Sequence, residues 1–176
     1  VNAPFGPDAG ADTRREFVAL CARNDLRIAE VGVWNNPLDA DPDKRKEALD
    51  RAKRCLQLAE DLGAACAVNI AGSCGDRWDG PYAANLSQDT FDLIVEQVRE
   101  ILRAVDPKRT AYTLETMPWV FPDSPEPYVD LVRAIDHPGF GAHLDIVNMI
   151  VSPRLYFGNA EFSRHCVETL RPWIKG

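Results

Sequence analysis

Two acidic residues, Glu115 and Asp145, lie near the ends of two apolar segments that the sequence predicts to be neighbouring strands. A buried carboxylate is costly unless a cation or hydrogen-bond donors accompany it. Two carboxylates that face one cavity repel each other unless a cation lies between them, and hard oxygen ligands suit ions such as Mg²⁺ or Mn²⁺. The pair therefore predicts a divalent-metal site. The alternative is that each carboxylate pairs with a local arginine or caps the next helix.

Other side chains at the predicted strand ends could complete such a site. His143 lies two residues before Asp145, so both point to the same face of the strand, where His143 orients the metal ligands or fills the core. Trp34 and Asn69 lie near the ends of predicted strands, and Trp119 follows one; we predict that all three contact substrate. Aromatic rings stack on the apolar faces of sugars, but tryptophans at these places equally cover the rim of a barrel.

A regular alternation of strands and helices positions these residues. The predicted strands are Leu26 to Trp34, Ala65 to Gly72, Arg109 to Thr116 and Phe140 to Val147. Helices between strands indicate a parallel sheet with crossover connections. The chain lacks the G-x-G-x-x-G turn that an open nucleotide-binding sheet would carry, which favours a barrel. We therefore predict an α/β fold, a partial (β/α)8 TIM barrel that forms a single domain over residues 1–176.

The helix boundaries are marked by local signals. Asp12 or Thr13 is expected to cap the first helix, and Asp41 precedes a proline at the start of the second. Gly63 supplies the stop of that second helix, and Ser87 caps the third. A fourth helix starts at Ser124-Pro125, and a final one is predicted over residues 160–170.

Composition excludes several classes of protein. The net charge of −7 disfavours binding to a nucleic-acid backbone, which needs clustered Lys and Arg. No apolar run approaches the roughly 20 residues that a membrane span requires, and no signal pattern opens the chain. The 5 cysteines are widely spaced without a C-x-x-C motif, which predicts free thiols and a cytoplasmic protein.

Two short motifs carry a resemblance to a known family. The segments TLET (residues 113–116) and HLDIVN (residues 143–148) resemble the sugar phosphate isomerase/epimerase family, the xylose-isomerase-like barrels that also include apurinic endonucleases of the endonuclease IV type. The stretches NIAGSCGDRWDGPY and EVGVWNNPL look like one branch of it, so the resemblance covers essentially the whole chain. It implies that the four strands are strands three to six of eight and that the chain is truncated at both ends.

The resemblance also implies roles for individual residues. Glu115 and Asp145 fall where the family binds a divalent metal (Mn, Mg, Co or Zn), and Glu115 where epimerases exchange the proton next to a substrate carbonyl. Asn148 stands where several relatives have a histidine that contacts substrate or metal. The implied activity is isomerisation or epimerisation of a sugar-like or sugar-phosphate-like small molecule, by an intact protein that could be a homo-oligomer.

Three alternatives stay open at this point. A metal-dependent hydrolase or lyase, or an endonuclease IV-like phosphodiesterase, would use the same ligands with extra histidines and a basic groove. A glycosidase would use Glu115 and Asp145 as its two carboxylates. A non-catalytic binding barrel would use neither.

A half barrel would also have two unpaired sheet edges, so the isolated segment is expected to be inactive and prone to aggregate.

Overall fold

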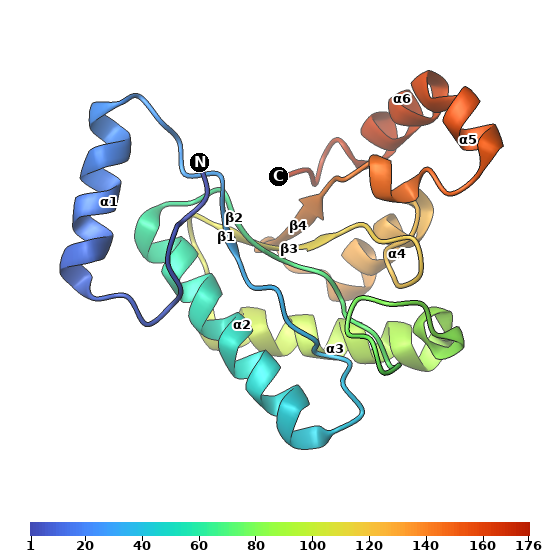
Figure 1. Cartoon of the computed structure of the whole chain (residues 1–176), viewed down its shortest axis with the longest axis horizontal. Coiled ribbons are helices and arrows are strands. Elements are labelled where there is room, and N and C mark those ends of the chain that lie inside the picture. The colour runs from blue at the N-terminus through green and yellow to red at the C-terminus, as the bar shows by residue number, and fades with distance from the viewer.

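A four-stranded parallel sheet forms the centre of the protein (Figure 1). The computed structural model describes residues 1–176, and the strand order is β1-β2-β3-β4. The strands are β1 (Glu30–Gly32), β2 (Cys66–Asn69), β3 (Ala111–Glu115) and β4 (Phe140–His143). Each lies inside a predicted strand but is shorter, because the outer residues of those predictions form no sheet ladder. The predicted partial-barrel architecture is confirmed.

Helices alternate with the strands and cover one face of the sheet. They are α1 (Ala11–Arg23), α2 (Pro42–Leu62), α3 (Gln88–Val105), α4 (Pro125–Ile135), α5 (Pro153–Phe157) and α6 (Asn159–Leu170), with short 3-10 helices η1 (Ala83–Leu86) and η2 (Val147–Met149). Helices α2, α3 and α4 lie side by side along the sheet (Figure 1). Alternate strand residues such as Val31, Ala67, Tyr112 and Leu114 join the core that these helices bury. None of the helices is both long and apolar enough to cross a membrane.

Most helix ends follow the predicted local signals. The Asp41 carboxylate accepts from the backbone N–H groups of residues 43 and 44, and the Ser87 hydroxyl accepts from residue 90. Gly63 ends α2 in the left-handed conformation with φ 67°. The predicted cap of α1 was wrong, because that helix begins at Ala11 after Gly10 and has no side-chain cap. Ser124 precedes α4 as predicted, without a capping hydrogen bond of its own.

Both edges of the sheet are partly paired, contrary to expectation. Asn2 forms a parallel bridge with Glu30 beside β1, and the N–H of Ala3 donates to the Glu30 carbonyl at 3.1 Å. At the opposite edge, Ile174 forms a parallel bridge with Ala142 of β4. The prediction of two unpaired edges was therefore wrong, since short terminal segments occupy both.

The sheet is strongly curled, so its two outer strands face each other. Glu30 of β1 and His143 of β4 lie at opposite ends of the strand order, yet Oε2 of Glu30 and Nε2 of His143 are 2.9 Å apart. This contact joins the first and last strands across the inner face of the sheet. Between them, the inward-facing Val68 and Thr113 have no exposed surface. The curl therefore encloses the inner face of the sheet, and the carboxyl ends of the strands lie together at one end of it.

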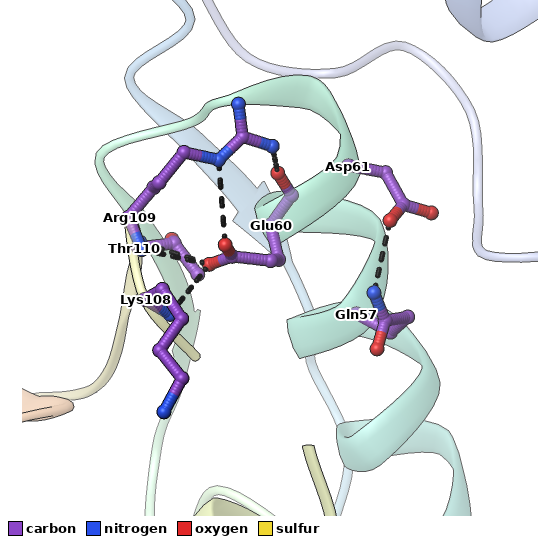
Figure 2. A network of polar contacts seen from close by, with 6 residues as sticks. All are labelled: Gln57, Glu60, Asp61, Lys108, Arg109 and Thr110. Atoms are coloured by element: carbon purple, nitrogen blue, oxygen red, sulfur yellow. Dashed lines mark hydrogen bonds and ion pairs between the residues drawn. The ribbon is translucent and has the colours of Figure 1, made fainter. Parts of the chain in front are cut away.

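A single carboxylate organises the opposite, amino-terminal end of the strands. Oε2 of Glu60, in the last turn of α2, accepts from the backbone N–H groups of Lys108, Arg109 and Thr110 at 3.1, 3.0 and 3.2 Å (Figure 2). The Arg109 guanidinium also reaches the Glu60 carboxylate at 3.3 Å and the backbone carbonyl of Glu60. This network fixes the entry to β3 on the end of α2.

Candidate active site at the carboxyl ends of the strands

Glu115 is the last residue of β3 and lies on the inner face of the sheet. It pairs in register with His143 of β4, and its side chain is half-buried. Burial raises the pKa of the Glu115 carboxyl, and the nearby His143 lowers it. The nearby Asp145 carboxyl raises the pKa further, and Glu30 adds further repulsion. Glu115 is therefore a carboxylate held among other carboxylates, with no arginine or lysine paired to it.

Asp145 lies two residues beyond β4, and its backbone is fixed by the neighbouring loops. Its Oδ1 atom accepts from the N–H groups of Val147 at 2.9 Å and Asn148 at 3.3 Å, so it caps the start of the turn at η2. Its carbonyl oxygen accepts from the Thr116 hydroxyl at 2.7 Å. The helix-capping alternative is thus partly realised. Because Oδ2 accepts no hydrogen bond from the protein, this atom is available to a ligand.

Asn148 ties the loop after β4 to the loop after β3. Its Nδ2 atom donates to the Thr116 carbonyl at 3.1 Å and lies 3.7 Å from the Met117 sulfur. The amide nitrogen therefore holds the two loops together and leaves Oδ1 as the atom that could contact substrate. That contact stays a prediction.

His143 is placed beside the two carboxylates, as its spacing predicted. Its Nε2 atom contacts Glu30, and its Nδ1 atom is buried without a hydrogen-bond partner. The imidazole lies opposite Glu115 in the β3–β4 ladder and lowers the pKa of this candidate metal ligand. Its role as an orienting residue around the metal stays a prediction that this placement supports.

Tyr128 is a site residue that sequence reasoning missed. It lies on α4, is fully buried, and donates its hydroxyl to the carbonyl of Leu114, the residue before Glu115. The same oxygen accepts from the N–H of His143 at 3.2 Å. The hydroxyl thus clamps the last rungs of the ladder that set Glu115 beside His143. In the sequence Tyr128 is one of several core positions of a helix, and no local signal separates it from them.

The other three predicted substrate contacts lie in different surroundings. Trp34 and Trp119 remain 45% and 41% exposed, and Nε1 of Trp119 donates to the Asp79 carbonyl at 3.2 Å. Asn69 has no exposed surface, and its amide atoms pair with Asn35 at 3.1 and 2.9 Å. Asn69 alternates with inward-facing neighbours on β2 and therefore points to the helices. Asn69 therefore holds Asn35 in place and does not face the inner side of the sheet.

The residues present suit a divalent cation in part. Glu115 and Asp145 supply hard oxygen ligands, and the repulsion that Asp145 and Glu30 add to the effect of burial on Glu115 would be relieved by a cation. No group of three or more His, Cys, Asp or Glu side chains in residues 1–176 is arranged to hold a metal ion. The chain therefore provides two carboxylates of a ligand set that would need more donors. A surface hollow of about 320 Å³ between α2 and α3 lies on the helix layer and includes neither of them.

The fold and this site define a class, a (β/α)-barrel protein with acidic side chains converging at the carboxyl ends of its strands. The chain belongs to the xylose isomerase-like TIM barrel family, whose model matches residues 2–166. No curated protein sequence matches the chain significantly.

Solved structures share the fold at low sequence identity. D-psicose 3-epimerase from Clostridium cellulolyticum H10, solved with D-tagatose, is 21% identical with a TM-score of 0.70, over 93% of this chain and 57% of that one. A xylose isomerase-like TIM barrel protein from Mycobacterium smegmatis, in complex with magnesium, is 17% identical with a TM-score of 0.65, over 96% and 56%. A probable 3-DHS dehydratase from Bacillus anthracis is 21% identical with a TM-score of 0.67, over 93% and 53%. The chain thus spans just over half the length of these structures.

Proposed function

We propose that the intact protein is a divalent-metal-dependent isomerase or epimerase that moves a proton at a carbon next to a carbonyl of a sugar-like substrate. One observation carries the proposal: Glu115 and Asp145 converge closely enough that Asp145 raises the pKa of Glu115. Such an arrangement is unfavourable without a cation and useful with one, since groups with shifted pKa values concentrate at functional sites. Among solved structures of this fold, one is a D-psicose 3-epimerase and another holds magnesium.

Each residue has a chemical task in this proposal. Glu115 and Asp145 would hold the cation, and a bound cation would supply charge stabilisation for the oxygens of the substrate. Glu115, at the end of β3, would take or return the carbon-bound proton as a general base and acid. The hydrogen bonds from Val147 and Asn148 orient Asp145 while leaving Oδ2 free.

A glycosidase would use the same two carboxylates without a metal, so removal of divalent cations by a chelator separates it from the proposed isomerase. A lyase is not separated in this way, because proton abstraction by Glu115 is also the first step of a dehydration, and one solved structure of this fold is a probable dehydratase.

The deciding experiment is Glu115→Gln in the intact protein, with Mn²⁺ binding and turnover measured together. Loss of a general base reduces kcat by about 10²- to 10⁴-fold. We expect that loss with Mn²⁺ still bound, because Asp145 and the glutamine oxygen remain. Unchanged turnover with bound metal would remove Glu115 from proton transfer. Hydrogen–deuterium exchange at the substrate carbon, followed by NMR, separates an epimerase from a lyase by its product.

A further inference from the structure

Trp34 has a backbone conformation that is unusual for its residue type. Its φ angle is +46°, and the other non-glycine residues with positive φ are the aspartates Asp25, Asp106 and Asp136. Aspartate tolerates this region because its short polar side chain bonds locally, and each of the three lies just after a helix. A bulky tryptophan gains no such compensation. Strain of this kind persists only where the surroundings impose it, and it concentrates at ligand sites.

The neighbours of Trp34 supply that constraint on both sides. The carbonyl of Val33 accepts from Nε of Arg51 at 3.0 Å, which ties it to α2. The N–H and the side-chain oxygen of Asn35 are both held by the buried amide of Asn69, at 3.1 and 2.9 Å. Residue 34 is therefore fixed between two anchored residues, and its side chain is the one group in this segment that stays largely exposed.

The indole of Trp34 folds back over Gly32 on the inner face of the sheet. A Cβ atom at Gly32 would lie 2.1 Å from Nε1 and 2.6 Å from Cδ1 of Trp34, so the ring occupies the space of a side chain at position 32. Gly32 alternates with Val31 and Val33, which face the helices, and shares its face with Glu30. The ring therefore lies against the inner face of β1, with 45% of the residue exposed.

We propose that Trp34 stacks against the apolar face of a ring-form substrate that carries its carbonyl on the ring, a cyclic keto-sugar or keto-polyol, and that Gly32 makes this possible. The inference rests on the proposed function, which locates the substrate between the inner face of β1 and the two carboxylates. A ring presents a flat C–H surface that matches an indole, whereas an open chain of the same formula presents none that is fixed. Gly32 is then a specificity-determining residue, because any side chain there would displace the indole from the inner face of β1.

The test follows the four indole N–H signals by NMR in the metal-free protein, so it is independent of turnover. Methyl β-D-glucopyranoside serves as the ring probe and D-glucitol, with the same six-carbon chain, as the open-chain probe. We expect the pyranoside to shift the Trp34 signal and D-glucitol to leave it unchanged. Equal shifts with both probes, or no shift with either, would overturn the stacking role. The Glu115→Gln experiment can fail without affecting this result, and the reverse also holds.

Matched variants separate stacking from a general effect on the fold. Gly32→Ala keeps the indole but displaces it, and we expect pyranoside binding to weaken by about tenfold. Trp34→Ala should weaken binding by at least as much. Trp78→Ala removes a comparably exposed tryptophan from the loop after β2 and should have no effect. Circular dichroism confirms that each variant folds, and equal binding by Gly32→Ala and the unaltered protein would refute the role of Gly32.

Discussion

Two glutamates at opposite ends of the strands have opposite electrostatic surroundings. Burial raises the pKa of Glu60, but hydrogen bonds from Arg109, Thr110 and Lys108 outweigh it and lower the pKa (Figure 2). Burial also raises the pKa of Glu115, and there Asp145 adds to the rise instead of opposing it. At the Glu60 end, hydrogen-bond donors stabilise the ionised carboxylate. At the Glu115 end, burial and neighbouring carboxyl groups disfavour the ionised form.

Under the proposed function, this contrast separates a stabilising carboxylate from a functional one within one fold. A barrel whose carboxylates were all matched with donors, as Glu60 is, would gain stability but would have no group ready to bind a cation or accept a proton. Functional sites commonly lower the stability of the fold for this reason. The following predictions are designed to test whether the two ends differ in this way.

The largest effect is expected at Asp145. Asp145→Asn removes a charged ligand but keeps the Oδ1 acceptor that Val147 and Asn148 use. We expect Mn²⁺ affinity, measured by electron paramagnetic resonance, to fall by about 100-fold or more. Urea unfolding of the metal-free protein should show no loss of stability, because repulsion of Glu115 is relieved. A variant that binds Mn²⁺ normally would contradict the proposed metal site.

At the opposite end, the expected effect is on stability alone. Glu60→Ala leaves three backbone N–H groups and Arg109 without their acceptor, and should lower the free energy of unfolding by about 2 kcal/mol. Glu47→Ala, an exposed glutamate on the same helix, serves as the control. Mn²⁺ affinity should stay unchanged in both variants. A marked fall in affinity in Glu60→Ala would mean that the two ends are coupled.

A smaller effect that combines stability and binding is expected at Tyr128. Tyr128→Phe removes the hydroxyl that joins Leu114 and His143, and should cost about 1 kcal/mol of stability. If the clamp positions Glu115, Mn²⁺ affinity should also fall, by about tenfold. Tyr112→Phe is a matched control, since Tyr112 is similarly buried and joins the core on the helix side of the sheet. Equal affinities in the two variants would reduce Tyr128 to a structural role.

The smallest effects are those of pH on the metal-free protein. The folded state keeps the Glu115 proton at pH values where the unfolded state has lost it, so this group lowers stability as pH rises above about 4.3. Glu115→Gln should therefore match the unaltered protein at low pH and exceed its stability at neutral pH. Glu60, whose pKa is lowered, stabilises the fold above the unfolded pKa and loses that contribution as pH falls through the folded one.

The pH test compares urea unfolding of both variants from acid to neutral pH. Glu60→Gln should be less stable than the unaltered protein at neutral pH, and the difference should vanish in acid. The two difference curves should therefore have opposite signs. Curves of the same sign would show that the two carboxylates are not in contrasting surroundings.

The sequence predicted much of the fold because its signals are local. The cap at Asp41, the left-handed Gly63 and the cap at Ser87 each depend on a few neighbouring residues, and all three are confirmed. Asn69 was predicted to contact substrate because it lies near a strand end, but its side chain points to the helices. The pleat decides which face a residue occupies, and alternation with Ala67 would have revealed the helix side.

By itself the sequence determined the alternation of strands and helices, and with it the strand ends that carry Glu115 and Asp145. Hydrophobic spacing and helix caps act over a few residues and can therefore be recognised in the linear chain. Only the tertiary structure decided that Glu30 meets His143, that Tyr128 clamps β3 to β4, and that the Trp34 indole replaces a side chain at Gly32. These contacts depend on the curl of the sheet and the packing of α4, which no local pattern in the sequence specifies.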